Sequence, residues 1–258
     1  MTAIFWRSIK DRRISLIVYM AAALLFMWMY VAMFPSIAAQ AESFTALIES
    51  FPPAVFEAFG IEDLNMSTIE SFLSVEHFSL VLPIMLIFML TSVAGRALAG
   101  EIELGTVELL IARPVSRLKL FVARYAAGMG ILITFTVISV FTVVPLAGLH
   151  GVEYHAASFA AGALIVFLLG WAVFSMAMMF SSLFSERSKV YMASGGILLT
   201  MYVLNVLALM KDNLDGLKYL SFFHYYAYSD ALVNQSLYGT GCLVFVCISR
   251  NVRRISVE

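Results

Sequence analysis

Long uncharged apolar blocks alternate with charged segments along this chain. Five blocks contain no Asp, Glu, Lys or Arg, and they cover residues 14–41, 77–95, 125–152, 154–185 and 190–210. Each block is at least about 18 residues long, roughly what one helix needs to cross a hydrocarbon core of about 30 Å. A soluble fold could not cover so much apolar surface, so the pattern predicts an all-α polytopic membrane protein.

We expect six transmembrane helices in a single domain that covers residues 1–258. The expected spans are residues 14–34, 78–95, 121–149, 156–184, 190–210 and 231–249. The last span is short, because the apolar core between Leu237 and Ile248 would extend only about 18 Å as a helix. Either this helix begins near Asp230 or the bilayer thins around it.

Composition and charge support this reading and give an orientation. Hydrophobic residues make up 62% of the chain and charged residues 13%, against about 45–50% and 25% in soluble domains. Of the 16 lysines and arginines, all but Lys211 and Lys218 lie in the two terminal tails and the loops after the second and fourth spans. The stretch 35–76 carries only acidic charges. The positive-inside rule then places both termini in the cytoplasm and requires an even number of spans in the cell membrane.

The N-terminal tail has its own pattern. Ile4, Phe5 and Trp6 precede the first of four basic residues, which are Arg7, Lys10, Arg12 and Arg13. Aromatic and basic side chains in this order are typical of an amphipathic helix that lies on the inner membrane surface. We expect this segment to anchor the first span.

The loop between the second and third spans is charged and amphipathic. A helix is predicted over Leu98–Ala112, with apolar and acidic residues on different faces. It should stop before Pro114, which biases Arg113 away from helical geometry, and Ser116 can cap the next helix. Periodicity alone leaves two readings open: an interfacial helix that only anchors two spans, or a lever that passes force from a soluble partner to the spans.

Four short motifs occur in this loop: Ala99-Gly100-Glu101, Gly105-Thr106, Glu108-Leu109-Leu110 and Pro114-Val115-Ser116-Arg117. Their order resembles the loop between the second and third spans of type-2 permeases of ATP-binding-cassette transporters. The outer stretch 51–60 also resembles the loop that these permeases carry after their first span. The resemblance implies a coupling element against an ATP-binding subunit, formed by Glu101, Gly105, Thr106, Glu108, Pro114 and Arg117.

The resemblance further implies the permease subunit of an exporter, working as a homodimer. The chain has no Gly-x-x-x-x-Gly-Lys-[Ser/Thr] sequence, which would cradle the phosphates of a nucleotide. ATP and magnesium would therefore bind a separate ATPase subunit, and the chain would be neither an enzyme by itself nor a holder of a cofactor. Its net charge of −1 gives no basis for binding nucleic acid.

Other chemistry has little support in the sequence. No His-Glu-x-x-His motif occurs, and His150 and His155 are expected to be exposed to solvent rather than to bind a metal. Glu76, His77 and Glu153 are expected at span ends, which argues against a secondary carrier, since such carriers keep ionisable groups inside the bilayer. Two alternatives stay open: a membrane scaffold or sensor that docks a cytoplasmic partner, and, less well supported, a secondary carrier or membrane enzyme.

Overall fold

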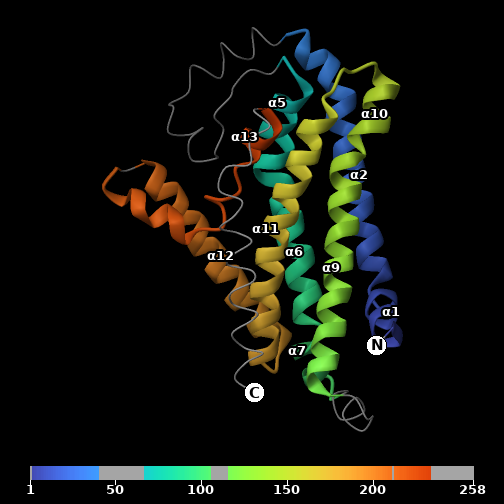
Figure 1. The fold of residues 1–258 in the computed structure, drawn as a ribbon, viewed down its shortest axis with the longest axis vertical. Helices are drawn as coiled ribbons and strands as arrows, with labels where there is room; N and C mark the ends of the chain where they lie inside the picture. Colours follow the sequence, from blue (N-terminus) through green and yellow to red (C-terminus); the bar gives the residue numbers. More distant parts are fainter. Residues whose placement is uncertain (1, 41–66, 106–115, 211, 234–258) are drawn as a thin grey trace.

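The structure, a computed structural model, describes residues 2–40, 67–105, 116–210 and 212–233. All regular elements in these ranges are helices (Figure 1). They are α1 (Thr2–Lys10), α2 (Arg13–Ala38), α5 (Ile69–Leu73), the π-helix η1 (Ser74–Val81), α6 (Leu82–Gly95), α7 (Ala99–Glu103), α9 (Arg117–Phe141), α10 (Val143–His150), α11 (Ala156–Leu183), α12 (Arg187–Met210), the 3₁₀-helix η2 (Asp212–Leu220) and α13 (Tyr228–Val233).

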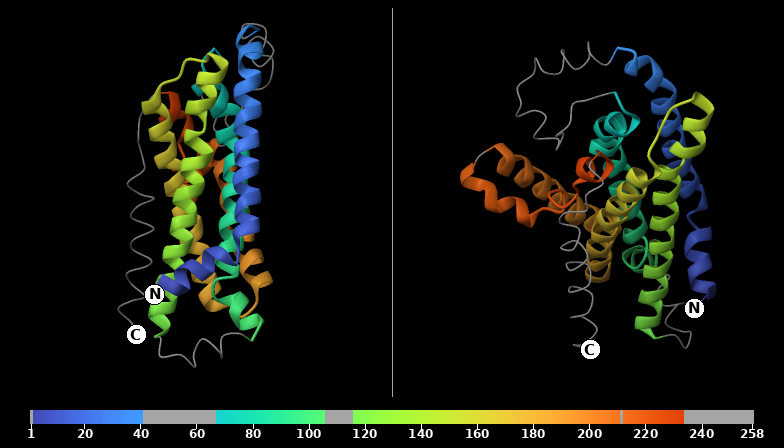
Figure 2. Two further views of the ribbon diagram at one scale, coloured as in Figure 1. Left: turned by 90° about the vertical axis from the view of Figure 1, so that its right-hand side faces the viewer. Right: turned by 45° about the horizontal axis from the view of Figure 1, so that its top comes forward.

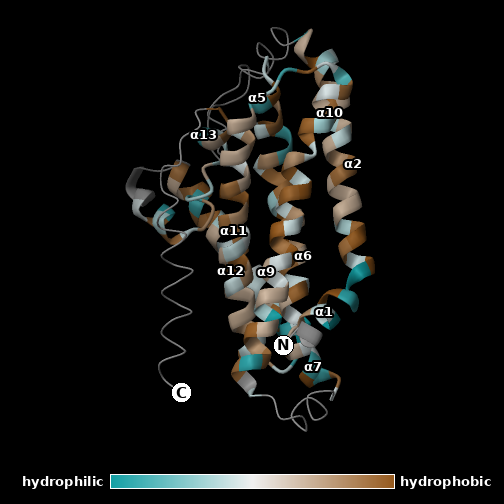
Figure 3. Ribbon diagram, turned by 45° about the vertical axis from the view of Figure 1, so that its right-hand side comes forward, coloured by the Kyte–Doolittle hydropathy of each residue, from teal (hydrophilic) through white to brown (hydrophobic). Residues whose placement is uncertain are grey.

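Within the described ranges, five helical segments are long and apolar enough to cross a membrane. They are Arg13–Ala38, Ile69–Gly95, Leu118–His150, Ala156–Leu183 and Arg187–Leu209. Most residues along these segments are apolar, and hydrophilic residues gather at the end of the bundle that carries α1 and α7 (Figure 3). We call this the basic end. The predicted all-α membrane fold is confirmed, whereas most of the sixth predicted span and the 51–60 motif lie outside the described residues.

Helix α11 lies at the centre of the bundle and packs against α6, α9, α12 and α13 (Figures 1 and 2). Its contact with α9 is tightly packed, since a Cβ added to Gly128 would lie 2.0 Å from the Phe174 ring. Phe174 is fully buried, as are Leu132 and Phe135 of α9. Helix α12 diverges from the others toward its C-terminal end, where η2 folds back along it (Figure 1).

The second span differs from its prediction. It begins at Ile69 rather than at residue 78, because Thr68 caps the helix, with its hydroxyl accepting a hydrogen bond from the Ser71 amide at 3.2 Å. Glu76 and His77 therefore lie about 12 Å inside this helix at 1.5 Å per residue. They lie within a continuous helix rather than before its start, and His77 is fully buried, with neither ring nitrogen hydrogen-bonded to another described residue.

The π-helix η1 carries these residues and is held by two tyrosines. A π-helix replaces the i−4 hydrogen-bond partner with i−5 and so leaves carbonyl groups at its ends in need of donors. The Tyr226 hydroxyl donates to the Phe78 carbonyl at 2.9 Å, and the Tyr30 hydroxyl donates to the Glu76 carbonyl at 3.3 Å. Both tyrosines are distant in sequence, so η1 joins α2 and the segment before α13 to the second span.

The contact between α9 and α11 can be tested by overpacking. Replacing Gly128 with Leu should lower the thermal unfolding midpoint of the detergent-purified protein, by the equivalent of about 1–3 kcal/mol, because the new side chain must displace the Phe174 ring. Gly148→Leu is the matched control, since no described atom lies within 4 Å of a Cβ added to Gly148. Equal midpoints for the two variants would show that this helix contact is not tightly packed.

Candidate functional site

Helix α7 follows the second span at the basic end and is held first by a serine of α11. The backbone amides of Leu98 and Ala99 both donate to the Ser181 hydroxyl oxygen, each at 3.2 Å. These amides lie at the N-terminal end of α7 and have no acceptor within the helix itself. Ser181 is fully buried, so a side chain more than 80 residues away caps this helix.

Two ion pairs tie α7 to two further spans. Arg124 of α9 donates from Nη2 to Oε1 of Glu101 at 2.7 Å, and the Arg124 side chain is only 8% exposed. Arg187, the first residue of α12, donates from Nε and Nη2 to the two oxygens of Glu103 at 3.0 and 3.2 Å. The Glu103 carboxylate also accepts the Arg187 backbone amide at 2.9 Å, and so caps α12.

We call Ser181 and these two ion pairs the α7 clamp. The clamp connects one short helix to α9, α11 and α12 at once. In its most exposed part, hydrogen bonds from Arg187 lower the pKa of Glu103 below its ordinary value. The stabilisation from a lowered carboxylate pKa is present at pH values above the ordinary glutamate pKa and is lost only as the pH falls through the lowered value. The Glu103–Arg187 pair is therefore intact at neutral pH.

The helix predicted over Leu98–Ala112 is interrupted. Helix α7 ends at Glu103, and Gly105 adopts a left-handed backbone with φ of 68°. Glycine is the usual residue just past a helix C-terminus, because it has no Cβ to clash in this conformation. A single continuous helix over the predicted range is therefore wrong, and no described atom lies within 4 Å of a Cβ added to Gly105.

The structure places three of the six predicted coupling residues. Glu101 lies in α7 and is part of the clamp, Gly105 lies two residues beyond α7, and Arg117 is the first residue of α9. The predicted cap of α9 is confirmed, since the Ser116 hydroxyl accepts the Lys119 amide at 3.3 Å. Thr106, Glu108 and Pro114 lie outside the described residues, so the roles predicted for all six stay predictions.

The sequence reading missed the residues that hold α7. The charge pattern indicates only that Arg124 is one of the positive charges of the loop, whereas it is buried in α9 and paired with Glu101. The same pattern gives no partner for Arg187. Ser181 carried no signal at all, because a serine in an apolar helix usually bonds its own backbone. Charge could have suggested the partners of Glu101 and Glu103, but not which basic residue pairs with which.

No group of three or more His, Cys, Asp or Glu side chains that could hold a metal ion occurs in the described part of the chain. His150 is exposed and the His155 side chain is 75% exposed, as predicted. Its ring nitrogen Nδ1 lies 3.4 Å from Glu70, which also accepts the His155 backbone amide at 2.6 Å. This pair of contacts fixes the start of α11 rather than building a reactive site.

A family comparison agrees with the loop motifs and the helical bundle. The family model described as ABC-2 family transporter protein matches residues 2–242. No curated protein and no solved structure matches the chain. The family match covers nearly all of the chain, including the bundle and the α7 clamp. The chain therefore belongs to the ABC-2 family of transporter proteins, as a multi-pass membrane protein of that family.

Proposed function

We propose that this chain is the permease subunit of an ATP-driven exporter, in which a separate ATPase subunit binds ATP and magnesium. Two copies of the chain would form the translocation path, and each would dock one ATPase on the segment 101–117. Both termini would face the cytoplasm, and the cell membrane would hold the spans.

The α7 clamp is the observation that carries this proposal. A coupling element has to pass a displacement at its surface to the transmembrane helices rather than absorb it. Helix α7 is five residues long and is bonded to α9, α11 and α12. Side chains that are buried or paired on three neighbouring helices leave it little freedom to move alone. A push on α7 would therefore move the ends of three spans.

The orientation of the chain supports a cytoplasmic docking partner. The clamp lies at the basic end, beside α1 and the first turns of α9 and α12 (Figures 1 and 3). The positive-inside rule assigns such an end to the cytoplasm. An ATPase is a cytoplasmic partner, and the family to which the chain belongs is one of transporters.

Co-purification tests the proposal directly. The chain is expressed with the candidate ATPase subunit, isolated in detergent and returned to lipid, and vanadate-sensitive ATP hydrolysis is measured with and without the chain. A stable complex with ATPase activity and nucleotide-dependent transport supports the permease. Stable binding without stimulated hydrolysis would support a scaffold or sensor instead. Substrate movement in proteoliposomes without nucleotide would support a secondary carrier.

Substitutions in the loop should uncouple the two subunits. Glu108→Lys reverses one charge of the proposed docking surface, and it should lower ATP-driven transport at least tenfold, since a like-charge contact in place of an ion pair costs more than about 1.4 kcal/mol. Membrane insertion and expression should not change. Glu153→Lys, which makes the same charge change on an exposed residue between α10 and α11, should leave transport intact. Full activity of Glu108→Lys would refute the assignment of this residue.

Gly105 offers a test that separates backbone strain from a partner contact. Gly105→Ala introduces the strain of a left-handed backbone, about 1–2 kcal/mol, and little bulk. Gly105→Trp introduces the same strain and a large side chain, whose Cβ has no described atom within 4 Å. A much greater loss of coupled ATPase activity for Trp than for Ala is expected, because the indole would clash with the ATPase. Equal losses would show that no partner surface covers Gly105.

The clamp itself should be needed for coupling more than for folding. Ser181→Ala removes the acceptor of the buried Ala99 amide and of the part-buried Leu98 amide, at a cost of about 1–3 kcal/mol for the unpaired groups. We expect more ATP to be hydrolysed per substrate transported, because α7 can then move without the spans. Thr200→Ala is the control, since the Thr200 hydroxyl bonds only the Gly196 carbonyl in its own helix. An unchanged ratio for Ser181→Ala would exclude the clamp as the coupling path.

A further inference from the structure

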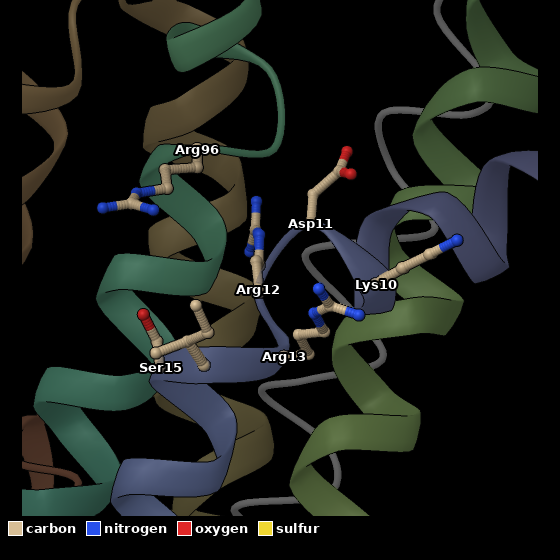
Figure 4. Close-up of a pocket in the computed structure, with 7 residues that line it drawn as sticks. Lys10, Asp11, Arg12, Arg13, Ser15 and Arg96 are labelled. Carbon is tan, nitrogen blue, oxygen red and sulfur yellow. The ribbon is translucent and has the colours of Figure 1, made fainter.

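A cleft of about 590 Å³ opens at the basic end where α1 turns into α2 (Figure 4). Three elements form it: the end of α1 with the following turn, the first residues of α2, and the residue after α6. Four of its lining side chains are basic and one is acidic. The polar residues are Lys10, Asp11, Arg12, Arg13, Ser15 and Arg96.

The positive charge of this cleft is not balanced within the described residues. Lys10, Arg13 and Arg96 form no ion pair with any of them, and the carboxylate of Asp11 lies 3.6 Å from Arg7 of its own helix. Arg12 projects between Arg96 and Asp11 (Figure 4). It is only 9% exposed and donates a hydrogen bond to the Val93 carbonyl of α6, so its charge is fixed in the wall of the cleft.

Arg12 lies in a cationic environment that an anion would relieve. Burial, with repulsion from Arg124 and Arg96, lowers the pKa of Arg12 to about 10. Glu101 opposes this effect, but its carboxylate is already bonded to Arg124. Phosphate oxygens are good partners for such a group, because a guanidinium can donate two parallel hydrogen bonds to them.

The surroundings of the cleft select a lipid among phosphate-bearing ligands. Trp6 of α1 is 65% exposed, as is usual for tryptophan at the level of the headgroups. The first turns of α2, which continue from the cleft, carry exposed apolar side chains: Ile14, Ile17 and Val18 are 72%, 62% and 61% exposed. A headgroup in the cleft would leave its acyl chains along this apolar surface.

We propose that this cleft binds the phosphate headgroup of an anionic phospholipid, with Arg13 and Arg96 as exposed ligands around the fixed Arg12. The ligand comes from the leaflet that faces the basic end, which is the inner leaflet in the topology proposed above. Basic pockets between transmembrane helices are known to suit such headgroups. Binding needs no ATPase, so a failure of this inference and a failure of the transport proposal are distinguishable.

The test is equilibrium binding of acyl-labelled phosphatidylglycerol to the full chain in dodecyl maltoside, with phosphatidylcholine of the same acyl chains as the comparison. Phosphatidylglycerol should bind at least about tenfold more tightly. Arg13→Gln and Arg96→Gln should each weaken it about fivefold, as expected for one basic residue near an anionic headgroup. Asp11→Asn should strengthen it, because it removes the one acidic group of the cleft.

Two controls decide between this site and less specific alternatives. Lys189→Gln removes one positive charge from α12, outside the cleft, and should leave the affinity unchanged; Lys189 is exposed and paired with Glu186. A loss equal to that of Arg96→Gln, or equal affinities for the two lipids, would overturn the proposal in favour of diffuse charge attraction. Displacement of phosphatidylglycerol by millimolar inorganic phosphate would overturn the lipid in favour of a free phosphate site.

Discussion

The requirement that every backbone amide and carbonyl be satisfied without water determines how these helices are joined. Within a span the α-helical ladder meets this requirement. Where the ladder is interrupted, a side chain from another element completes it: Tyr226 at Phe78 in η1, Glu70 at the start of α11, Ser181 at the start of α7 and Arg12 at the end of α6. Each of these bonds both removes the cost of an unpaired group and fixes one helix against another.

Side-chain hydrogen bonds of this kind stabilise the structure where the helical backbone hydrogen bonds are interrupted. Helix α7 is too short to be stable alone, because forming the first turn of a helix is unfavourable. Its order comes from Ser181, Arg124 and Arg187, which belong to three different spans. Because contacts with the neighbouring spans keep α7 ordered, its position depends on theirs. A displacement of α7 would conversely be transmitted to those spans. This is the physical basis for treating it as a lever.

The sequence was sufficient for the parts of the fold that depend on local pattern. Uncharged blocks located the five described spans, and the Ser116 cap was found from its position after Pro114. The charge pattern does not give the start of the second long helix, because the last charge before the uncharged block does not mark where the helix begins. Thr68 and Ile69 show that a capped helix carries Glu76 inside it. The α7 clamp was out of reach, since Ser181 lies 83 residues from Leu98 and no local pattern connects them.

The charged side chains of the α7 clamp interact electrostatically with those of the cleft at the basic end. Arg12 is repelled by Arg124 and Arg96 and attracted by Glu101, while Glu101 is bonded to Arg124. An anion beside Arg12 would offset the repulsion that Arg124 and Arg96 exert on it, and would also act on the nearby Arg124–Glu101 pair. Charges in a partly buried setting interact over several ångströms with little screening. A headgroup in the cleft would therefore act on the same group of charges that holds α7, namely Arg12, Arg124 and Glu101.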